Sequence, residues 1–138
     1  YDPNKEVVDK NNRIKLKKEA DKEFIKLSGD VDKMRRVLRI FGNAKPQELS
    51  EIQVENTLYE IKDKQAERFL KIVTDKNLDL RSEIEEMVAA GVIRKIGNQH
   101  IYGEETIGEN ITDTIIYFKN KKNSGQVNAM RAQLKTLA

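Results

Sequence analysis

"GVIRKIGNQHIYG", residues 91–103, is the stretch in which strand and turn signals replace the helical periodicity of the preceding sequence. Short apolar runs lie on either side of Gly97-Asn98, and a glycine stands at each end. The pattern predicts two short strands around a tight turn, although Gly-Asn is a weaker turn signal than Asn-Gly. We therefore expect a β-hairpin near residues 92–102. The functional question is whether this hairpin is the wing of a DNA-binding domain or only closes a helical core.

Most of the remaining sequence has the periodicity of amphipathic helices, with apolar residues at steps of three and four. We expect helices over residues 13–27, 30–41, 46–61, 66–73, 79–90, 110–118 and 127–137. The polar segment "YDPNKEVVDKNN" instead predicts an extended or mobile arm over residues 1–12, because proline disfavours helix at the residue before it. The predicted fold class is mostly α: a compact single helical domain over residues 13–138, with one small β-hairpin in a winged-helix-like segment.

The composition narrows the class of protein. The chain has 138 residues, of which 38% are hydrophobic and 36% charged, which indicates one ordinary domain with a small core and a highly charged surface. It contains no cysteine, so disulfides and thiolate metal sites are excluded. No apolar run reaches the roughly 18 residues of a membrane span. Because the sequence begins at Tyr1, we expect a processed product or part of a longer protein.

Charge is distributed unevenly along the chain. The formal net charge is about +5 over residues 1–45, about −5 over residues 46–91 and about +3 over residues 92–138. A protein built for one long nucleic-acid contact would more often be basic along a continuous surface. The observed distribution suits head-to-tail contacts between copies of the chain about as well as it suits DNA.

The sequence contains no catalytic motif. His100 is the only histidine, and a general base or metal site needs convergent partners, so we expect a surface or half-buried side chain. Glu83 and Glu86 share a helix face, but no histidine lies at metal-binding spacing there. The glycines match no phosphate-binding loop. We expect a non-enzymatic protein without metal, cofactor or small-molecule substrate.

Nucleic-acid binding is the alternative function. Its best candidates are the basic side chains of the second helix and of the hairpin: Lys33, Arg35, Arg36, Arg39, Arg94 and Lys95. The order helix, helix, helix, hairpin between residues 47 and 103 resembles a winged helix, whose last helix before the wing enters the major groove. Here that helix carries Glu83, Glu85 and Glu86, and carboxylates would be repelled by phosphates. The pattern therefore indicates a protein-interaction module rather than a groove reader.

The C-terminal half resembles a family. A helix ending in "AAGVIRKIGNQ", a "GEETIG" turn, a helix with "IIYF" and a last helix closing on "AMRAQL" are similar to small proteins of tailed bacteriophages. The resemblance covers residues 69–134, carries no catalytic signature, and implies a location in the virion or the host cytoplasm. We expect a structural or assembly module with protein partners, copies of itself among them. Its last helix would use Val127, Met130, Leu134 and Leu137 against the core or a partner.

Overall fold

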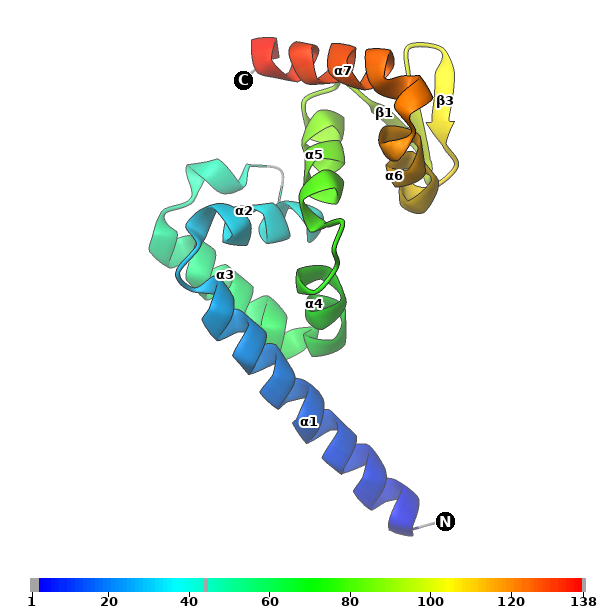
Figure 1. Cartoon of the computed structure of the whole chain (residues 1–138). Helices are drawn as coiled ribbons and strands as arrows, with labels where there is room; N and C mark the ends of the chain where they lie inside the picture. The colour runs from blue at the N-terminus through cyan, green and yellow to red at the C-terminus, as the bar shows by residue number, and fades with distance from the viewer. Residues whose placement is uncertain (1–2, 44, 138) are drawn as a thin grey trace. The chain divides into compact units, whose positions relative to one another are not determined.

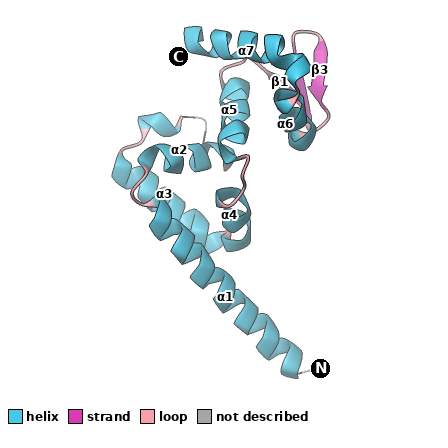
Figure 2. Cartoon of the chain, in the orientation of Figure 1, coloured by secondary structure: helices cyan, strands magenta, loops and turns pink. Residues whose placement is uncertain are grey.

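The structure, a computed structural model, describes residues 3–43 and 45–137. Within these ranges the chain is mostly helical with one small antiparallel sheet (Figure 1, Figure 2), which confirms the predicted fold class. The elements in chain order are α1 (Pro3–Leu27), α2 (Val31–Ile40), the 3-10 helix η1 (Pro46–Glu48), α3 (Glu51–Lys64), α4 (Ala66–Val73), α5 (Leu78–Ala89), β1 (Arg94–Ile96), β2 (Gln99–Tyr102), β3 (Glu105–Gly108), α6 (Ile111–Lys119), the 3-10 helix η2 (Lys121–Asn123) and α7 (Ser124–Leu137).

Two hydrophobic cores divide the chain into two compact units, with the boundary in the sequence between Leu78 and Asp79. In the first unit, α1 to α4 enclose buried side chains such as Phe69. In the second unit, Met87 of α5 and Met130 of α7 are fully buried together with side chains of the sheet and α6. This differs from the single domain predicted over residues 13–138. Helical periodicity shows which side of a helix is apolar, but not which neighbour covers that side.

Helix α1 is longer than the sequence predicted. It begins at Pro3 and continues to Leu27, so the extended or mobile arm predicted over residues 1–12 is wrong for residues 3–12; Tyr1 and Asp2 lie outside the described residues. Proline is tolerated in the first helical turn, because the N–H that it lacks would have no helical partner there. Pro3 therefore starts the helix instead of excluding it.

The caps of α2 and α3 follow local hydrogen-bonding signals. The Asp30 side chain accepts a hydrogen bond from the backbone N–H of Lys33 at 3.1 Å, as expected of an N-cap. The third helix begins later than predicted, because Pro46 lies in η1 and not in α3. Ser50 caps α3 instead: its hydroxyl accepts from the Gln53 N–H, and the Gln53 side chain accepts from the Ser50 N–H.

The predicted hairpin is present and belongs to a three-stranded sheet. β1 and β2 pair around Gly97-Asn98, with Ile96 opposite Gln99, and Gly97 has a φ of +60°. The sequence did not predict β3, which pairs with β2 after a second reversal at Gly103, where φ is +62°. Both glycines occupy the left-handed region that side chains with a Cβ rarely adopt. The sheet order is β1-β2-β3, so β2 is the central strand.

Candidate protein-interaction surface

The basic residues of α2 do not form one open surface. Arg35 donates from Nη2 to the backbone oxygen of Leu49 at 3.2 Å, and Arg39 donates to Oε1 of Gln47 at 2.9 Å. Arg39 is 8% exposed, while Lys33 is half-buried and Arg36 exposed. Arg35 and Arg39 therefore hold η1 and the residue that follows it against α2. Two of the four predicted phosphate-binding cations thus make hydrogen bonds that stabilise the fold.

The two basic residues of the hairpin lie in β1, in the second unit. Arg94 donates from Nη2 to the backbone oxygen of Gly103 at 2.7 Å, which ties β1 to the turn between β2 and β3. Lys95 is exposed and stands opposite His100 in the sheet. The candidate nucleic-acid residues thus belong to two separate units, α2 in the first and β1 in the second.

The last helix contributes mainly to the second core. Val127 is 3% exposed and Met130 is fully buried, while Leu134 is half-buried against the same core. Leu137 remains exposed. Of the four residues predicted to pack in the core or against a partner, the first two are core residues. They are unavailable to a partner while the unit stays folded.

The acidic residues before the hairpin also have partners inside the second unit. α5 is helical over the segment in which the sequence predicted a recognition-type helix. Its Glu83 accepts a bidentate pair of hydrogen bonds from Arg131 of α7, with the shortest nitrogen–oxygen distance at 2.9 Å. Glu85 and Glu86 are half-buried. Glu83 therefore connects α5 to α7, and a nucleic acid could approach it only by replacing Arg131.

His100 is buried, which corrects the expectation of a surface or half-buried side chain. It is 1% exposed in the central strand β2, between Lys95 of β1 and Gly108 of the unpredicted strand β3. Neither ring nitrogen has a partner in good hydrogen-bond geometry among the described residues, and the Asn98 backbone is close enough only to oppose slightly the lowering of the His100 pKa. Burial, with the positive charge of Lys95, lowers the pKa of His100. No group of three metal-ligating side chains occurs in residues 3–43 and 45–137.

The surface that the sequence analysis missed is the N-terminal half of α1. Every residue from Asn4 to Lys15 is exposed, and these residues include Val7 at 58%, Val8 at 54% and Ile14 at 45%. In the C-terminal half, by contrast, Ala20 and other apolar side chains are buried in the first core. One continuous helix thus has a packed half and a half in which every residue from Asn4 to Lys15 is exposed.

The change along α1 has a simple cause in the sequence. At 100° per residue, the core-facing side of the C-terminal half continues into Glu6, Asp9 and Arg13 in the N-terminal half. Burial of these charged side chains would be unfavourable, so this side of the N-terminal half stays in water. Val7 and Ile14 stand seven residues apart and roughly 120° around the helix from the core-facing side. They form an apolar stripe that faces away from the core of the first unit.

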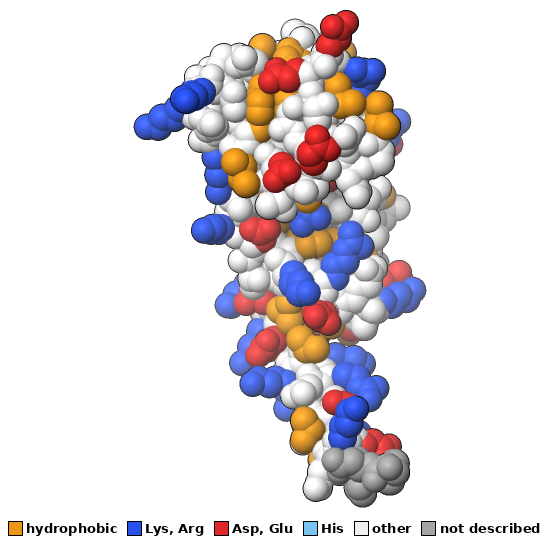
Figure 3. Space-filling view, turned by 90° about the vertical axis from the view of Figure 1, so that its right-hand side faces the viewer, with side chains coloured by type: hydrophobic (Ala, Val, Ile, Leu, Met, Phe, Trp, Pro, Cys, Tyr) orange, Lys and Arg blue, Asp and Glu red, His pale blue; other side chains and the backbone are white. Residues whose placement is uncertain are grey.

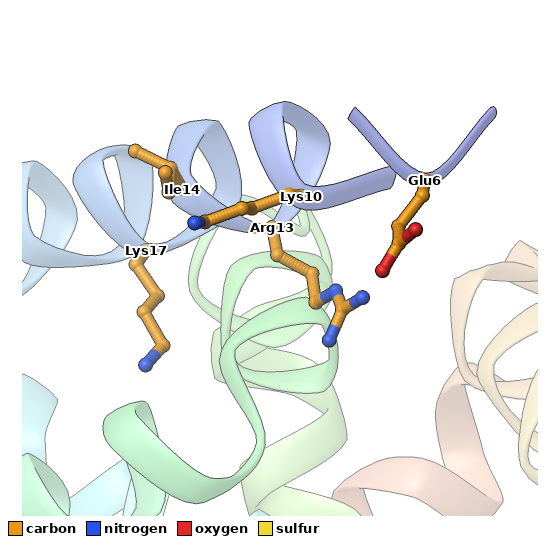
Figure 4. Close-up of a pocket in the computed structure, with 5 residues that line it drawn as sticks. All are labelled: Glu6, Lys10, Arg13, Ile14 and Lys17. Atoms are coloured by element: carbon orange, nitrogen blue, oxygen red, sulfur yellow. The ribbon is translucent and has the colours of Figure 1, made fainter. Parts of the chain in front are cut away.

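Basic side chains flank this stripe. Residues 3–19 contain six lysines and arginines and three acidic residues, and Figure 3 shows blue side chains gathered over this end of the chain with orange ones between them. A shallow hollow of about 310 Å³ runs along one side of the helix; its lining residues are Glu6, Lys10, Arg13, Ile14 and Lys17. In Figure 4, Arg13 and Lys17 reach to one side while Ile14 points away from them. Because one helix supplies the whole lining, the hollow is an open face and encloses no ligand.

The exposed half of α1 is a poor helix on its own. An isolated helix of about 12–15 residues is marginal in water even with good helix formers. Here Val7, Val8, Asn11 and Asn12 are all poor ones. A helix that lacks both intrinsic propensity and tertiary contacts gains most of its stability from whatever packs on it. The seven-residue spacing of Val7 and Ile14 was the available sequence signal, and the expectation of an arm obscured it.

No protein-family model, curated protein or solved structure matches this chain. Although α1 has 25 residues, none of the helices in the described ranges is both long and apolar enough to cross a lipid bilayer.

Proposed function

We propose that this chain is a non-enzymatic assembly module that binds another protein through the N-terminal half of α1. The observation that carries the proposal is the run of exposed helical residues from Asn4 to Lys15, with an apolar stripe at Val7 and Ile14. Amphipathic helices commonly bind protein partners through side chains at such spacing. The lysines beside the stripe favour an acidic partner surface, since charge complementarity steers encounter and orientation.

The setting that we propose is a bacteriophage virion or its assembly in the host. It is supported only by the likeness of residues 69–134 to small phage proteins, which identifies no binding residue. The partner contact proposed here lies outside that segment and depends on α1 alone. The two parts of the proposal can therefore fail independently.

Nucleic acid is the competing partner of the same basic helix. It would neutralise Lys10, Arg13 and Lys17 with phosphates and would leave Val7 and Ile14 in water. A protein partner covers the apolar side chains as well, and burial of apolar surface supplies most of the affinity in protein association. The apolar stripe is therefore the feature that favours protein over nucleic acid.

A photoreactive amino acid placed at Ile14 of the full chain tests this function. After irradiation in cells that produce the chain, we expect protein adducts at this position. The same substitution at the exposed Asn12, which lies on another side of the helix, is the matched control and should give far fewer adducts. Equal labelling at both positions, or adducts that nuclease removes, would contradict a protein-binding stripe.

A further inference from the structure

Helix α3 carries an exposed face that mirrors the one on α1. Ile52 is 71% exposed and Tyr59 is 50% exposed, and they stand seven residues apart. Glu51 and Glu55 lie beside them, are exposed, and form no ion pair within the described part of the chain. The α3 face therefore combines an apolar stripe with negative charge, whereas the α1 face combines an apolar stripe with positive charge.

The two faces match residue by residue in spacing. On α1 the order is Val7, Lys10, Ile14, at steps of three and four. On α3 the order is Ile52, Glu55, Tyr59, at the same steps. Side by side and parallel, the two helices would pair two apolar positions and one lysine with a glutamate.

The ring of Tyr59 is held in place by two contacts within the first unit. Its ring lies edge-on to Phe24, with centroids 5.5 Å apart, and Nζ of Lys62 lies 3.9 Å from the centre of the same ring. One side of the ring is thus held by the first unit while half of its surface faces water. A rigid, half-exposed aromatic side chain is the type of residue that anchors protein interfaces.

A protomer cannot make this contact with itself. Asp21 of α1 pairs with Lys62 of α3, and Phe24 pairs with Tyr59, so the two helices run antiparallel and the N-terminal half of α1 continues past the C-terminal end of α3 (Figure 1). At 1.5 Å per residue, Val7 and Ile52 of one chain are separated by more than about 30 Å along the helix axes. The α1 of another chain is free of that constraint.

We propose that the N-terminal half of α1 in one copy of the chain packs on the exposed face of α3 in a second copy, with Val7, Lys10 and Ile14 against Ile52, Glu55 and Tyr59. This inference rests on the proposed function and names its partner. Because the two faces differ, the contact is head-to-tail and leaves an unused α1 and an unused α3 on every pair. Such contacts continue into a ring or a filament.

The contact is small and depends on salt. Two short helix faces bury less area than a standard protein interface, so association is weak and strengthens at high local concentration. The exposed lysine–glutamate pair is screened by added salt. These properties suit a module that assembles many copies side by side.

Sedimentation velocity of the full chain, nuclease-treated and measured over a range of concentrations at low salt, tests the inference. We expect concentration-dependent association beyond the dimer. Ile52→Ser should weaken it at least about tenfold, since an exposed apolar contact is lost. Ile116→Ser, at another exposed isoleucine in the second unit, should not weaken it. Lys10→Glu and Glu55→Lys should each weaken it roughly fivefold, and the double variant should restore it.

The outcomes separate this inference from the proposed function. A chain that stays monomeric at every concentration overturns the inference, as does association that Ile52→Ser and the charge exchange leave unchanged. If Ile14→Ser abolishes association while the α3 variants have no effect, α1 binds a copy elsewhere; the proposed function then survives and the α3 assignment is wrong. Circular dichroism of each variant shows that the helices remain formed.

Discussion

Phe24 of α1 and Tyr59 of α3 meet edge-to-face, with ring centroids 5.5 Å apart and ring planes at 78°. This contact closes the packed half of α1 onto α3 and holds Tyr59 half in water. Lys62 lies beneath both rings and forms ion pairs with Asp21 and with Asp63. The aromatic pair and its lysine therefore belong to the packed half of α1, whereas the exposed half lies nearer the N-terminus, from Asn4 to Lys15.

Replacing Lys62 with methionine should destabilise the first unit by about 1 kcal/mol. The cost is moderate because Asp21 and Asp63 are more than half exposed and are left in water, not stranded in the core. Hydrogen exchange of peptides from residues 45–77 measures the loss. A cost above about 3 kcal/mol would contradict the idea that the carboxylates are readily solvated without their lysine.

The same lysine predicts a pH dependence at the alkaline end. Burial alone would lower the pKa of Lys62, but its hydrogen bonds to Asp21 and Asp63 outweigh burial and raise the pKa above the usual 10.5. The charged form is thus favoured in the folded state. The contribution of Lys62 to the stability of the first unit is therefore complete below pH 10.5 and is lost as the pH rises further. In the Lys62→Met variant the loss of stability at alkaline pH should disappear. An unchanged alkaline stability profile in that variant would contradict the assignment of the loss to Lys62.

His100 predicts a pH dependence of the opposite sign in the second unit. Burial lowers its pKa below the usual 6.5, so the neutral form is favoured in the folded state and the unfolded chain binds more protons near pH 6. Stability should be complete above pH 6.5 and fall as the pH drops below it. Glu85 opposes this effect and Lys95 adds to it.

The variant His100→Leu removes the titrating ring from a site where neither nitrogen has a partner in good hydrogen-bond geometry among the described residues. Unfolding of residues 79–137, followed by hydrogen exchange at pH 7.5 and pH 5, should then lose most of its pH dependence. Retention of the full dependence in the variant would assign it to other groups.

Arg39 tests whether the basic residues of α2 are structural. Arg39→Ala removes a charge-assisted hydrogen bond to Gln47 from a side chain that is 8% exposed, and should cost the first unit about 2 kcal/mol. Lys15→Ala, at an exposed lysine of α1, is the control and should stay within about 0.5 kcal/mol. Equal, small effects of the two substitutions would contradict a stabilising role for Arg39.

Gly108 is required by close packing between β3 and α6. A Cβ at this position would stand 2.6 Å from the backbone nitrogen of Thr114 and 2.9 Å from its Cα, and backbone atoms cannot move aside easily. Gly108→Ala should therefore destabilise the second unit by about 3 kcal/mol. In α7, Gly125 has no atom within 4 Å of an added Cβ, so Gly125→Ala should stabilise by up to about 1 kcal/mol. Similar effects at both glycines would contradict the packing described here.

Periodicity and turn residues predicted the parts of the fold that local chemistry determines. The hairpin at Gly97-Asn98 and the cap at Asp30 follow from signals within a few residues. The burial of His100 and the engagement of Arg35 and Arg39 depend on segments distant in the sequence or irregular in structure, and no local pattern contains that information. Strand β3 was missed because "GEETIG" has too few apolar residues to alternate.

The interaction surface was missed for a related reason. Composition and Pro3 together predicted an arm over residues 1–12, and without a helix Val7 and Ile14 had no shared face. Once α1 is known to begin at Pro3, the stripe can be derived from the sequence by counting. The charge asymmetry between the first and middle thirds of the chain suits contacts between copies about as well as it suits DNA, and the proposed α1–α3 contact assigns specific residues to the first of these two alternatives.

The most direct test of the account uses the absence of cysteine in this chain. Two variants, Val7→Cys and Ile52→Cys, are prepared separately, mixed in equal amounts and oxidised, and the products are resolved by mass. If α1 of one copy packs on α3 of another, the mixed disulfide should form several times faster than either variant links to itself, because only that pair meets the distance a disulfide requires. Linkage of Val7→Cys chains to one another at the same rate, or no linkage in the mixture, would contradict the account.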